Sequence, residues 1–319
     1  MSGVLLAAAL LWEPGEPVLH RVRVEQVQMG SRFVLTCYAA DRDAAKRACR
    51  AAGRRVKGVS AALSDYHDRS ELNRLCDRYV VGVPEPAGDD LFTVLRAARG
   101  FSKLSGGAFD ATVGPVVTLW RRARRSRELP DPDELAAARA RVDWEAVTLN
   151  DDARTVTFAR PGVRLDLGGI AKGYAADVAL AVLREHDITR ALVDAGGDIV
   201  AGDPPPGRDG WAVGLGGADG ATTPLANAAV ATSGDLFKHV EIDGVRYSHI
   251  VDPRTGLGLT DRSTITVLAP DGMTADALAS AVSVLGPDAG VALLEGTDGA
   301  EGRVVTPGGV RATGGWIGE

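Results

Sequence analysis

The segment Arg190–Asp203, RALVDAGGDIVAGD, holds two short apolar runs that are separated by a Gly-Gly pair. Short apolar runs bounded by glycine and aspartate are typical of β-strands joined by turns. The chain then continues with further runs of the same kind: WAVGLGG, AAVATSG, HVEIDGVRYSHIVD and STITVLAP. Because no helical pattern separates these runs, the segment predicts a set of antiparallel strands rather than βαβ units.

Strand and helix patterns continue on both sides of this segment. Residues 22–39 alternate apolar and polar side chains and predict two strands flanking Met29-Gly30, and further strands are expected around Val147, Val156, Val304 and Gly315. Apolar residues at helical spacing predict separate helices over 41–63, 89–107, 133–141, 171–186 and 274–286. The sequence therefore favours an α+β fold, with mixed sheets and packed helices.

Length and composition fit one globular domain. The chain has 319 residues, of which 45% are hydrophobic and 24% charged. We expect a single domain over residues 21–319, preceded by an extension over 1–20 that is either a remnant of an export signal or an apolar segment packed on the domain. The net charge of -6 argues against a general nucleic-acid binder, because such proteins need excess lysine and arginine.

The cysteines, the basic stretch and two glycine-rich stretches do not by themselves indicate a function. The three cysteines, Cys37, Cys49 and Cys76, have spacings that fit neither a zinc site nor a disulfide framework, so we interpret them as core thiols. The basic stretch Trp120–Leu135 is interpreted as a solvated helix face, with contact to an anionic partner as the alternative. GLGGADG and GGIAKGY fail the spacing of the dinucleotide and P-loop motifs.

Two stretches combine groups that bind phosphate and metal. LDLGGIAKGYAAD (Leu165–Asp177) places a Gly-Gly pair and Lys172 at the start of a helix, where amides and an ammonium group suit a diphosphate. TADALAS carries Asp276 and, four residues later, Ser280. On a helix this spacing puts a carboxylate and a hydroxyl on one face, and both are oxygen ligands suited to Mg²⁺.

Two further stretches add polar residues at the ends of apolar segments. GGAFDATVGP sets Phe109 and Asp110 after two glycines, and the loop SHIVDPRTGLG (Ser248–Gly258) supplies a histidine, an aspartate and an arginine. Each feature also has a structural reading: Gly-Gly pairs are usually turns, Asp276 alone fits a helix-dipole carboxylate, and His249 alone fits a half-buried histidine. Taken separately, none of these features decides a function.

Taken in order, the motifs resemble those of the ApbE family of flavin transferases. The resemblance runs from Met29-Gly30 to the DALAS helix, through SELNRL, GAFDATVGPVVTLW, LDLGGIAKGYAAD, DAGGDI, ATSG and HIVDPRTG. It implies Mg²⁺-dependent transfer of the FMN moiety of FAD to a Ser or Thr hydroxyl of an acceptor protein, with release of AMP. The implied acceptor is a separate flavoprotein subunit of an electron-transfer system, with a motif close to Asp-x-x-[Ser/Thr]-Gly-Ala-Thr.

The resemblance also implies roles for individual residues. Asp276 and Ser280 would bind the metal by side chain, with backbone carbonyls from Gly169 and Ala279. His249 would accept the proton of the attacking hydroxyl, so that His249 and Asp276 form the catalytic pair. The FAD pocket would contain eight residues: Met29, Tyr66, Ala108, Phe109, Asp110, Asp166, Lys172 and Ile250. The family usually has threonine where this chain has Ser31 and Ser280.

Three expectations concern what the motifs leave open. An FAD pyrophosphatase giving FMN and AMP would use the same residues, with water replacing the acceptor hydroxyl. A non-catalytic flavin-binding protein is the alternative of another class, and loss of the metal carboxylate or the histidine would be its expected feature. The family resemblance implies an extracytoplasmic location, periplasmic or membrane-associated, whereas the N-terminus shows no clear signal or lipobox and leaves a cytoplasmic location as the alternative.

Overall fold

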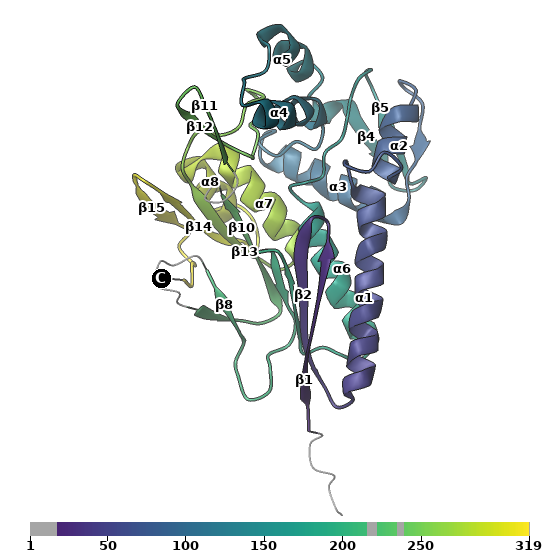
Figure 1. Ribbon diagram of the computed structural model, residues 1–319, viewed down its shortest axis with the longest axis vertical. Coiled ribbons are helices and arrows are strands. Elements are labelled where there is room, and N and C mark those ends of the chain that lie inside the picture. Colours follow the sequence, from purple (N-terminus) through teal and green to yellow (C-terminus); the bar gives the residue numbers. More distant parts are fainter. Residues whose placement is uncertain (1–17, 216–221, 235–238, 319) are drawn as a thin grey trace, which may run out of the picture.

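The computed structural model describes residues 18–215, 222–234 and 239–318. Within these ranges the main element is an eight-stranded sheet in the order β1-β2-β6-β7-β10-β13-β14-β15 (Figure 1). Every neighbouring pair is antiparallel. The strand bounds are β1 His20–Gln28, β2 Ser31–Ala39, β6 Ala191–Ala195, β7 Ile199–Ala201, β10 Ala228–Gly234, β13 Thr264–Ala269, β14 Glu301–Thr306 and β15 Gly309–Ala312.

Three helices cover one face of this sheet: α1 (Arg42–Leu63), α6 (Ala171–Glu185) and α7 (Gly272–Leu285). Their contact faces are rich in alanine and glycine, which lets the backbones approach closely. Helices α6 and α7 approach closely, and a Cβ atom added to Gly173 would lie 2.0 Å from the carbonyl oxygen of Gly272. Any larger side chain at residue 173 would therefore push the first turns of the two helices apart.

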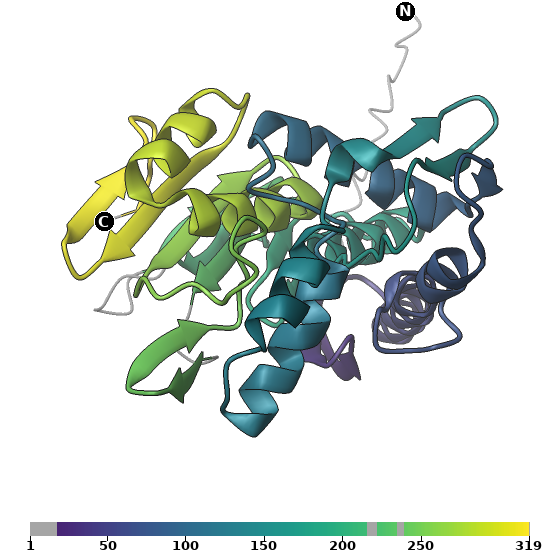
Figure 2. The same cartoon turned by 90° about the horizontal axis from the view of Figure 1, so that it is seen from above.

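A second group of elements packs beside the ends of these helices (Figure 2). It contains α3 (Asp89–Leu104), α4 (Gly114–Ser126) and α5 (Pro132–Arg139), with the short helix α2 (Glu71–Arg78) and a small sheet in the order β3-β5-β4. That sheet consists of β3 Glu85–Pro86, β4 Val147–Asn150 and β5 Thr155–Phe158, and the 3₁₀ turn Trp144–Ala146 precedes β4. Two hairpins, β8 (Trp211–Gly214) with β9 (Thr222–Leu225) and β11 (His239–Ile242) with β12 (Val245–Ser248), and helix α8 (Pro287–Glu295) complete the described structure.

The predicted α+β class and its long helices are confirmed, with differences at short elements. The expected strand near Gly315 lies earlier, at β15, and helices α2 and α8 were not predicted. The three cysteines are buried thiols, as expected. Residues 1–17, and most of the GLGGADG stretch, lie outside the described residues. In the described ranges, no helix has both the length and the apolarity needed to cross a bilayer.

Candidate active site

The predicted metal-binding carboxylate lies at the contact between α6 and α7. Asp276 is buried on α7, and its Oδ2 atom accepts a hydrogen bond of 3.1 Å from the backbone N–H of Gly173. Gly173 belongs to the first turn of α6, where backbone N–H groups carry the positive end of the helix dipole. This bond orients the carboxylate. It also occupies one of the α6 amides that the sequence suggested for a diphosphate.

Two more oxygen atoms converge beside Asp276. Ser280 lies one helical turn further along α7, and its hydroxyl is 3.4 Å from the carbonyl oxygen of Gly169, to which it donates a hydrogen bond. A Cβ atom at residue 169 would lie only 2.7 Å from Ser280 Oγ and 3.4 Å from the ring of Phe109. The glycine thus allows the backbone before α6, the α7 hydroxyl and an aromatic ring to meet at one point.

This donor set fits a small, hard cation. Mg²⁺ is commonly held by one or two carboxylates together with water and substrate phosphates, rather than by a complete protein cage. In the described part of the chain, no group of three or more His, Cys, Asp and Glu side chains could hold a metal ion. A metal here would therefore depend on Asp276, Ser280 and Gly169 plus ligand oxygens. The backbone carbonyl of Ala279, which was also predicted to bind the metal, accepts a 2.8 Å hydrogen bond from Ser283 Oγ within α7.

Lys172 joins the same cluster through an ion pair that the sequence did not reveal. Its ammonium group pairs with Asp198, a buried carboxylate in the turn between β6 and β7. Burial alone would lower the pKa of Lys172, but the carboxylates of Asp276 and Asp198 raise it above its ordinary value. Burial raises the pKa of Asp198, and Asp276 adds to this effect, whereas Lys172 opposes it. Lys172 is therefore a charged side chain held between two acidic groups, and not a solvated lysine.

Asp166 and Tyr66 are brought together by an arginine of α4. Asp166 is buried; its Oδ1 accepts the Gly168 N–H at 2.8 Å, and its Oδ2 lies 3.0 Å from Arg121 Nη2. The same guanidinium pairs with Asp65 and lies over the ring of Tyr66, 4.1 Å from its centroid. Burial and the Asp65 charge raise the pKa of Asp166 to about 6, although Arg121 opposes this shift. The interpretation of the basic stretch as a solvated face is therefore wrong for Arg121.

The turn that contains Ala108, Phe109 and Asp110 connects α3 to α4. The Phe109 N–H donates to Ser105 Oγ at 3.0 Å, and Phe109 packs edge-on against Phe101. Asp110 Oδ1 accepts bonds of 2.7 Å from both the N–H and the hydroxyl of Thr112, and burial raises the pKa of Asp110. Ala108 is buried in the same turn. Asp110 thus holds the turn that places the Phe109 ring against Gly169.

Met29 lies at the tip of the β1–β2 hairpin. Met29 and Gly30 have φ angles of 50° and 67°, the left-handed pair expected of a tight hairpin turn. Ser31 packs against Gly196, because a Cβ atom at residue 196 would lie 2.8 Å from Ser31 Cβ. Gly196 is two residues before Asp198, so the hairpin tip lies beside the turn that holds the partner of Lys172.

His249 and Ile250 belong to the loop that follows β12, which is anchored on two helices. Trp120 Nε1 of α4 donates a 3.0 Å bond to the carbonyl of Ser248, just before His249. Arg254 pairs with Asp252 at 2.9 Å and donates to the carbonyl of Val284 on α7 at 3.1 Å. Asp252 and Arg254 therefore order the loop. His249 and Ile250 are half-buried.

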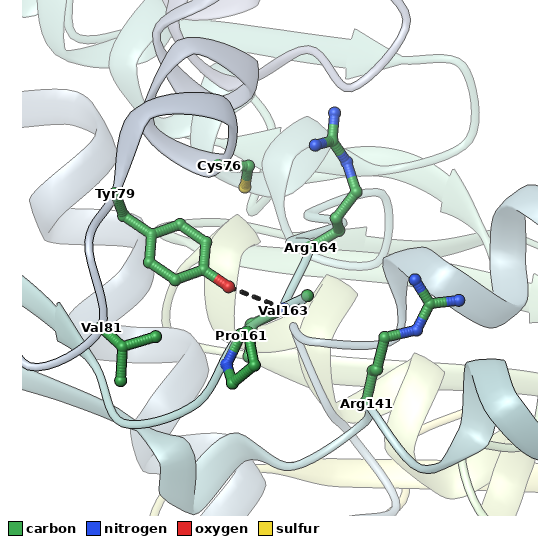
Figure 3. Close-up of a pocket in the computed structure, with 8 residues that line it drawn as sticks. Cys76, Tyr79, Val81, Arg141, Pro161, Val163 and Arg164 are labelled. Carbon is green, nitrogen blue, oxygen red and sulfur yellow. Dashed lines mark hydrogen bonds between the residues drawn. The ribbon is translucent and has the colours of Figure 1, made fainter.

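The cavity drawn in Figure 3 is a separate feature. It has a volume of about 360 Å³ and lies beside the loop Pro161–Arg164, where the hydroxyl of Tyr79 accepts a 2.9 Å bond from the Val163 N–H. None of the described residues that line it is among the predicted site residues. The chemistry indicated by the sequence therefore lies at the α6–α7 contact and the loops around it.

Comparison with known proteins agrees with this geometry. The family model described as the ApbE family matches residues 29–303. The chain belongs to the ApbE family. The FAD:protein FMN transferase of Haemophilus influenzae is 34% identical to it over 252 residues, which is 75% of this chain and 73% of that protein. The FAD:protein FMN transferase of Klebsiella pneumoniae is 30% identical over 296 residues, which is 88% of this chain and 87% of that protein.

Solved ApbE structures have the same fold. The flavin transferase ApbE from Vibrio cholerae superposes with a TM-score of 0.80 at 30% sequence identity, covering 93% of this chain and 98% of that one. ApbE of Pseudomonas stutzeri, a flavinyl transferase solved in its apo form, gives a TM-score of 0.81 at 26% identity, covering 93% and 95%. The expected family and fold of this chain are thereby confirmed.

Two charged residues of this ApbE-family chain had no predicted site role. Asp198 lies in the quoted DAGGDI motif, and an aspartate between a Gly-Gly pair and an apolar strand was the available signal. Arg121 lies among five arginines between residues 120 and 128, and nothing in the local pattern distinguishes it from the other four. The structure distinguishes it by its partners Asp65 and Asp166.

Proposed function

We propose that this chain uses Mg²⁺ to transfer the FMN moiety of FAD to a Ser or Thr hydroxyl of a separate acceptor protein, with release of AMP. FMN transfer from FAD to a protein is the activity that the relatives' names state, and this chain is a transferase of that kind. The metal, the product AMP and the residue roles are the proposed part. An acceptor that is a flavoprotein subunit of an electron-transfer system, and an extracytoplasmic location, belong to the same proposal.

One observation carries the proposal: the backbone at Gly169, the hydroxyl of Ser280 and the carboxylate of Asp276 converge next to the ammonium of Lys172. Phosphoryl transfer needs neutralised charge and fixed geometry more than it needs covalent help from the enzyme. A carboxylate and neutral oxygens suit Mg²⁺, and an ammonium suits a phosphate oxygen. When bound, Mg²⁺ would supply the positive charge that a diphosphate requires.

The proposed chemical step is a nucleophilic substitution at the FMN-side phosphorus of FAD. The acceptor hydroxyl oxygen forms a bond to the FMN-side phosphorus, the bond from that phosphorus to the bridging oxygen breaks, and AMP leaves with that oxygen. His249 takes the hydroxyl proton. Lys172 holds the diphosphate in place, Phe109 and Tyr66 offer aromatic surfaces to the rings of FAD, and Asp166 orders the glycine turn that ends at Gly169.

The direct test is an analysis of both products. Purified protein, FAD and Mg²⁺ are incubated with and without a protein carrying the Asp-x-x-Ser-Gly-Ala-Thr motif. We expect AMP to appear in proportion to the acceptor, and we expect EDTA to stop its release. Equal amounts of AMP and free FMN without any acceptor would instead show a pyrophosphatase, and FAD binding without either product would show a flavin-binding protein.

Replacement of Lys172 by methionine should raise the KM for FAD at least about tenfold, because a charge-assisted contact to phosphate is lost. The same variant should lose about 3 kcal/mol of unfolding free energy, because Asp198 is left buried without its cation. Steady-state kinetics and chemical denaturation measure the two effects separately.

The double variant K172M with Asp198→Asn separates the two roles. Replacing Asp198 by a neutral amide removes the unpaired buried charge, so most of the lost stability should return while the KM for FAD stays high. If the double variant also restored the KM, Lys172 would act only as the counter-ion of Asp198.

A further inference from the structure

Arg121 contacts three residues in two separate segments of the chain. It lies on α4, and the exposed fraction of its side chain is 26%. One guanidinium nitrogen pairs with Asp65, the other lies 3.0 Å from Asp166 Oδ2, and the guanidinium carbon lies 4.1 Å from the centroid of the Tyr66 ring. Asp65 and Tyr66 belong to the loop between α1 and α2, and Asp166 begins the glycine turn before α6.

The two segments that Arg121 links lie far apart in the sequence. Each is ordered by local hydrogen bonds of its own. Asn73 Nδ2 of α2 donates to the carbonyls of Asp65 and His67, each at 3.1 Å, and so shapes the loop that carries Tyr66. Asp166 holds the amide of Gly168, directly before Gly169. Arg121 links these two ordered segments by pairing with Asp65 in one and Asp166 in the other.

The stacking leaves one side of the Tyr66 ring available. Tyr66 is 74% exposed even though the guanidinium lies over it. A cation over an aromatic ring is attracted to the ring's π-face, and a guanidinium plane can stack there while its nitrogens donate hydrogen bonds in the same plane. The ring is thereby held in one orientation, with its remaining surface presented to solvent.

We propose that Arg121 is a positioning residue for FAD: it fixes the Tyr66 ring as a stacking surface and locks that ring to the Asp166–Gly169 turn. The inference rests on the proposed function in taking Tyr66 and Asp166 as contacts of FAD. The site for a ring of the dinucleotide and the site for its diphosphate are then held at a set separation by one guanidinium. Loss of Arg121 should weaken FAD binding while the groups around the phosphorus remain in place.

Only an arginine satisfies all three contacts. Its planar group can donate to two carboxylates from different nitrogens and still lie flat on a ring, whereas a lysine presents a single ammonium at the end of a flexible stem. Arg121→Lys should therefore keep the positive charge but lose the fixed orientation of the Tyr66 ring. Arg121→Met should lose both the charge and the orientation. Arg125, which is exposed on the same helix, provides the matched control.

The test measures FAD affinity by quenching of flavin fluorescence, and the KM and kcat of transfer, for R121M, R121K and R125M. We expect the Kd and KM of R121M to rise about tenfold and its kcat to change less than about threefold, with R121K intermediate and R125M equal to wild type. The Kd of the double variant Y66L/R121M for FAD should exceed that of the weaker-binding single variant by no more than about twofold. Both substitutions remove the same stacking surface.

Two results would overturn this role. One is an unchanged Kd in R121M and R121K, whatever their thermal stability. The other is a Y66L/R121M double variant whose fold-loss of FAD affinity equals the product of the fold-losses of the two single variants. R121K keeps the charge between the two aspartates, so it stays measurable if R121M does not fold. The Kd for FAD can be measured without turnover. Wild-type protein that binds FAD but transfers no FMN would therefore refute the proposed function, while the Kd of the Arg121 variants would still test the role of Arg121.

Discussion

Replacement of Asp276 by alanine should lower the rate of FMN transfer by at least about a hundredfold, the scale of losing one preorganised electrostatic group. Asp276 supplies the negatively charged oxygen of the donor set formed with Ser280 and Gly169. Asp276→Asn should show the same loss, because the amide can still accept the Gly173 N–H but carries no charge. Initial rates across a Mg²⁺ titration measure the effect.

Asp177, a half-buried carboxylate between the same two helices, offers a matched control. It accepts the N–H groups of Gly272 and Met273 at 2.7 and 2.8 Å, and burial raises its pKa to about 7. Asp177→Asn should lower stability without changing the Mg²⁺ dependence, because Asp177 holds the start of α7 rather than the metal. Transfer by D276N at nearly the wild-type rate, with unchanged Mg²⁺ dependence, would exclude Asp276 as the ligand.

Replacement of His249 by asparagine should slow transfer by about a hundredfold or more and leave FAD affinity unchanged. A positioned general base contributes about 10²–10⁴ to a rate. The fold of the loop should survive, since the Trp120–Ser248 and Arg254–Asp252 contacts anchor it. We expect the variant to lose the acidic limb of the wild-type pH–rate profile, because that limb reports protonation of the general base.

His186 is the control for this variant, because it is an exposed histidine at the end of α6 opposite to Gly169. His186→Asn should keep both the rate and its pH profile. An H249N protein with a wild-type profile would place the base on another residue.

The sequence predicted the parts of this protein that follow from periodicity and from local motifs. The helical spacing of α1, α6 and α7 was readable, and the four-residue interval between Asp276 and Ser280 placed both on one face of α7. The Gly168-Gly169 pair was predicted to lie at a helix start that suits a diphosphate, and the structure shows that a side chain at residue 169 would meet Ser280. Short helices such as α2 were missed, because eight residues carry little periodic signal.

The charged network could not be predicted, since it depends on contacts between distant segments. Lys172 and Asp198 are 26 residues apart, and Arg121 meets partners 56 and 45 residues away. A run of arginines on one helix looks the same at each position until tertiary packing turns one of them inward. The interpretation of Trp120–Leu135 as a solvated face therefore applies to exposed members such as Arg125 and fails at Arg121.

Transfer in trans is tested most directly by intact-mass analysis of both partners after the chain is incubated with FAD, Mg²⁺ and a protein carrying the Asp-x-x-Ser-Gly-Ala-Thr motif. We predict that one FMN becomes covalently attached to the last threonine of that motif, survives denaturation and is absent when EDTA is present. We also predict no FMN on this chain: Thr274, in its near-motif DGMTADA, donates to Asp271 in the first turn of α7 and lies two residues from Asp276. An unmodified acceptor, or a stable FMN adduct on Thr222, Thr223 or Thr274 of this chain, would contradict transfer in trans.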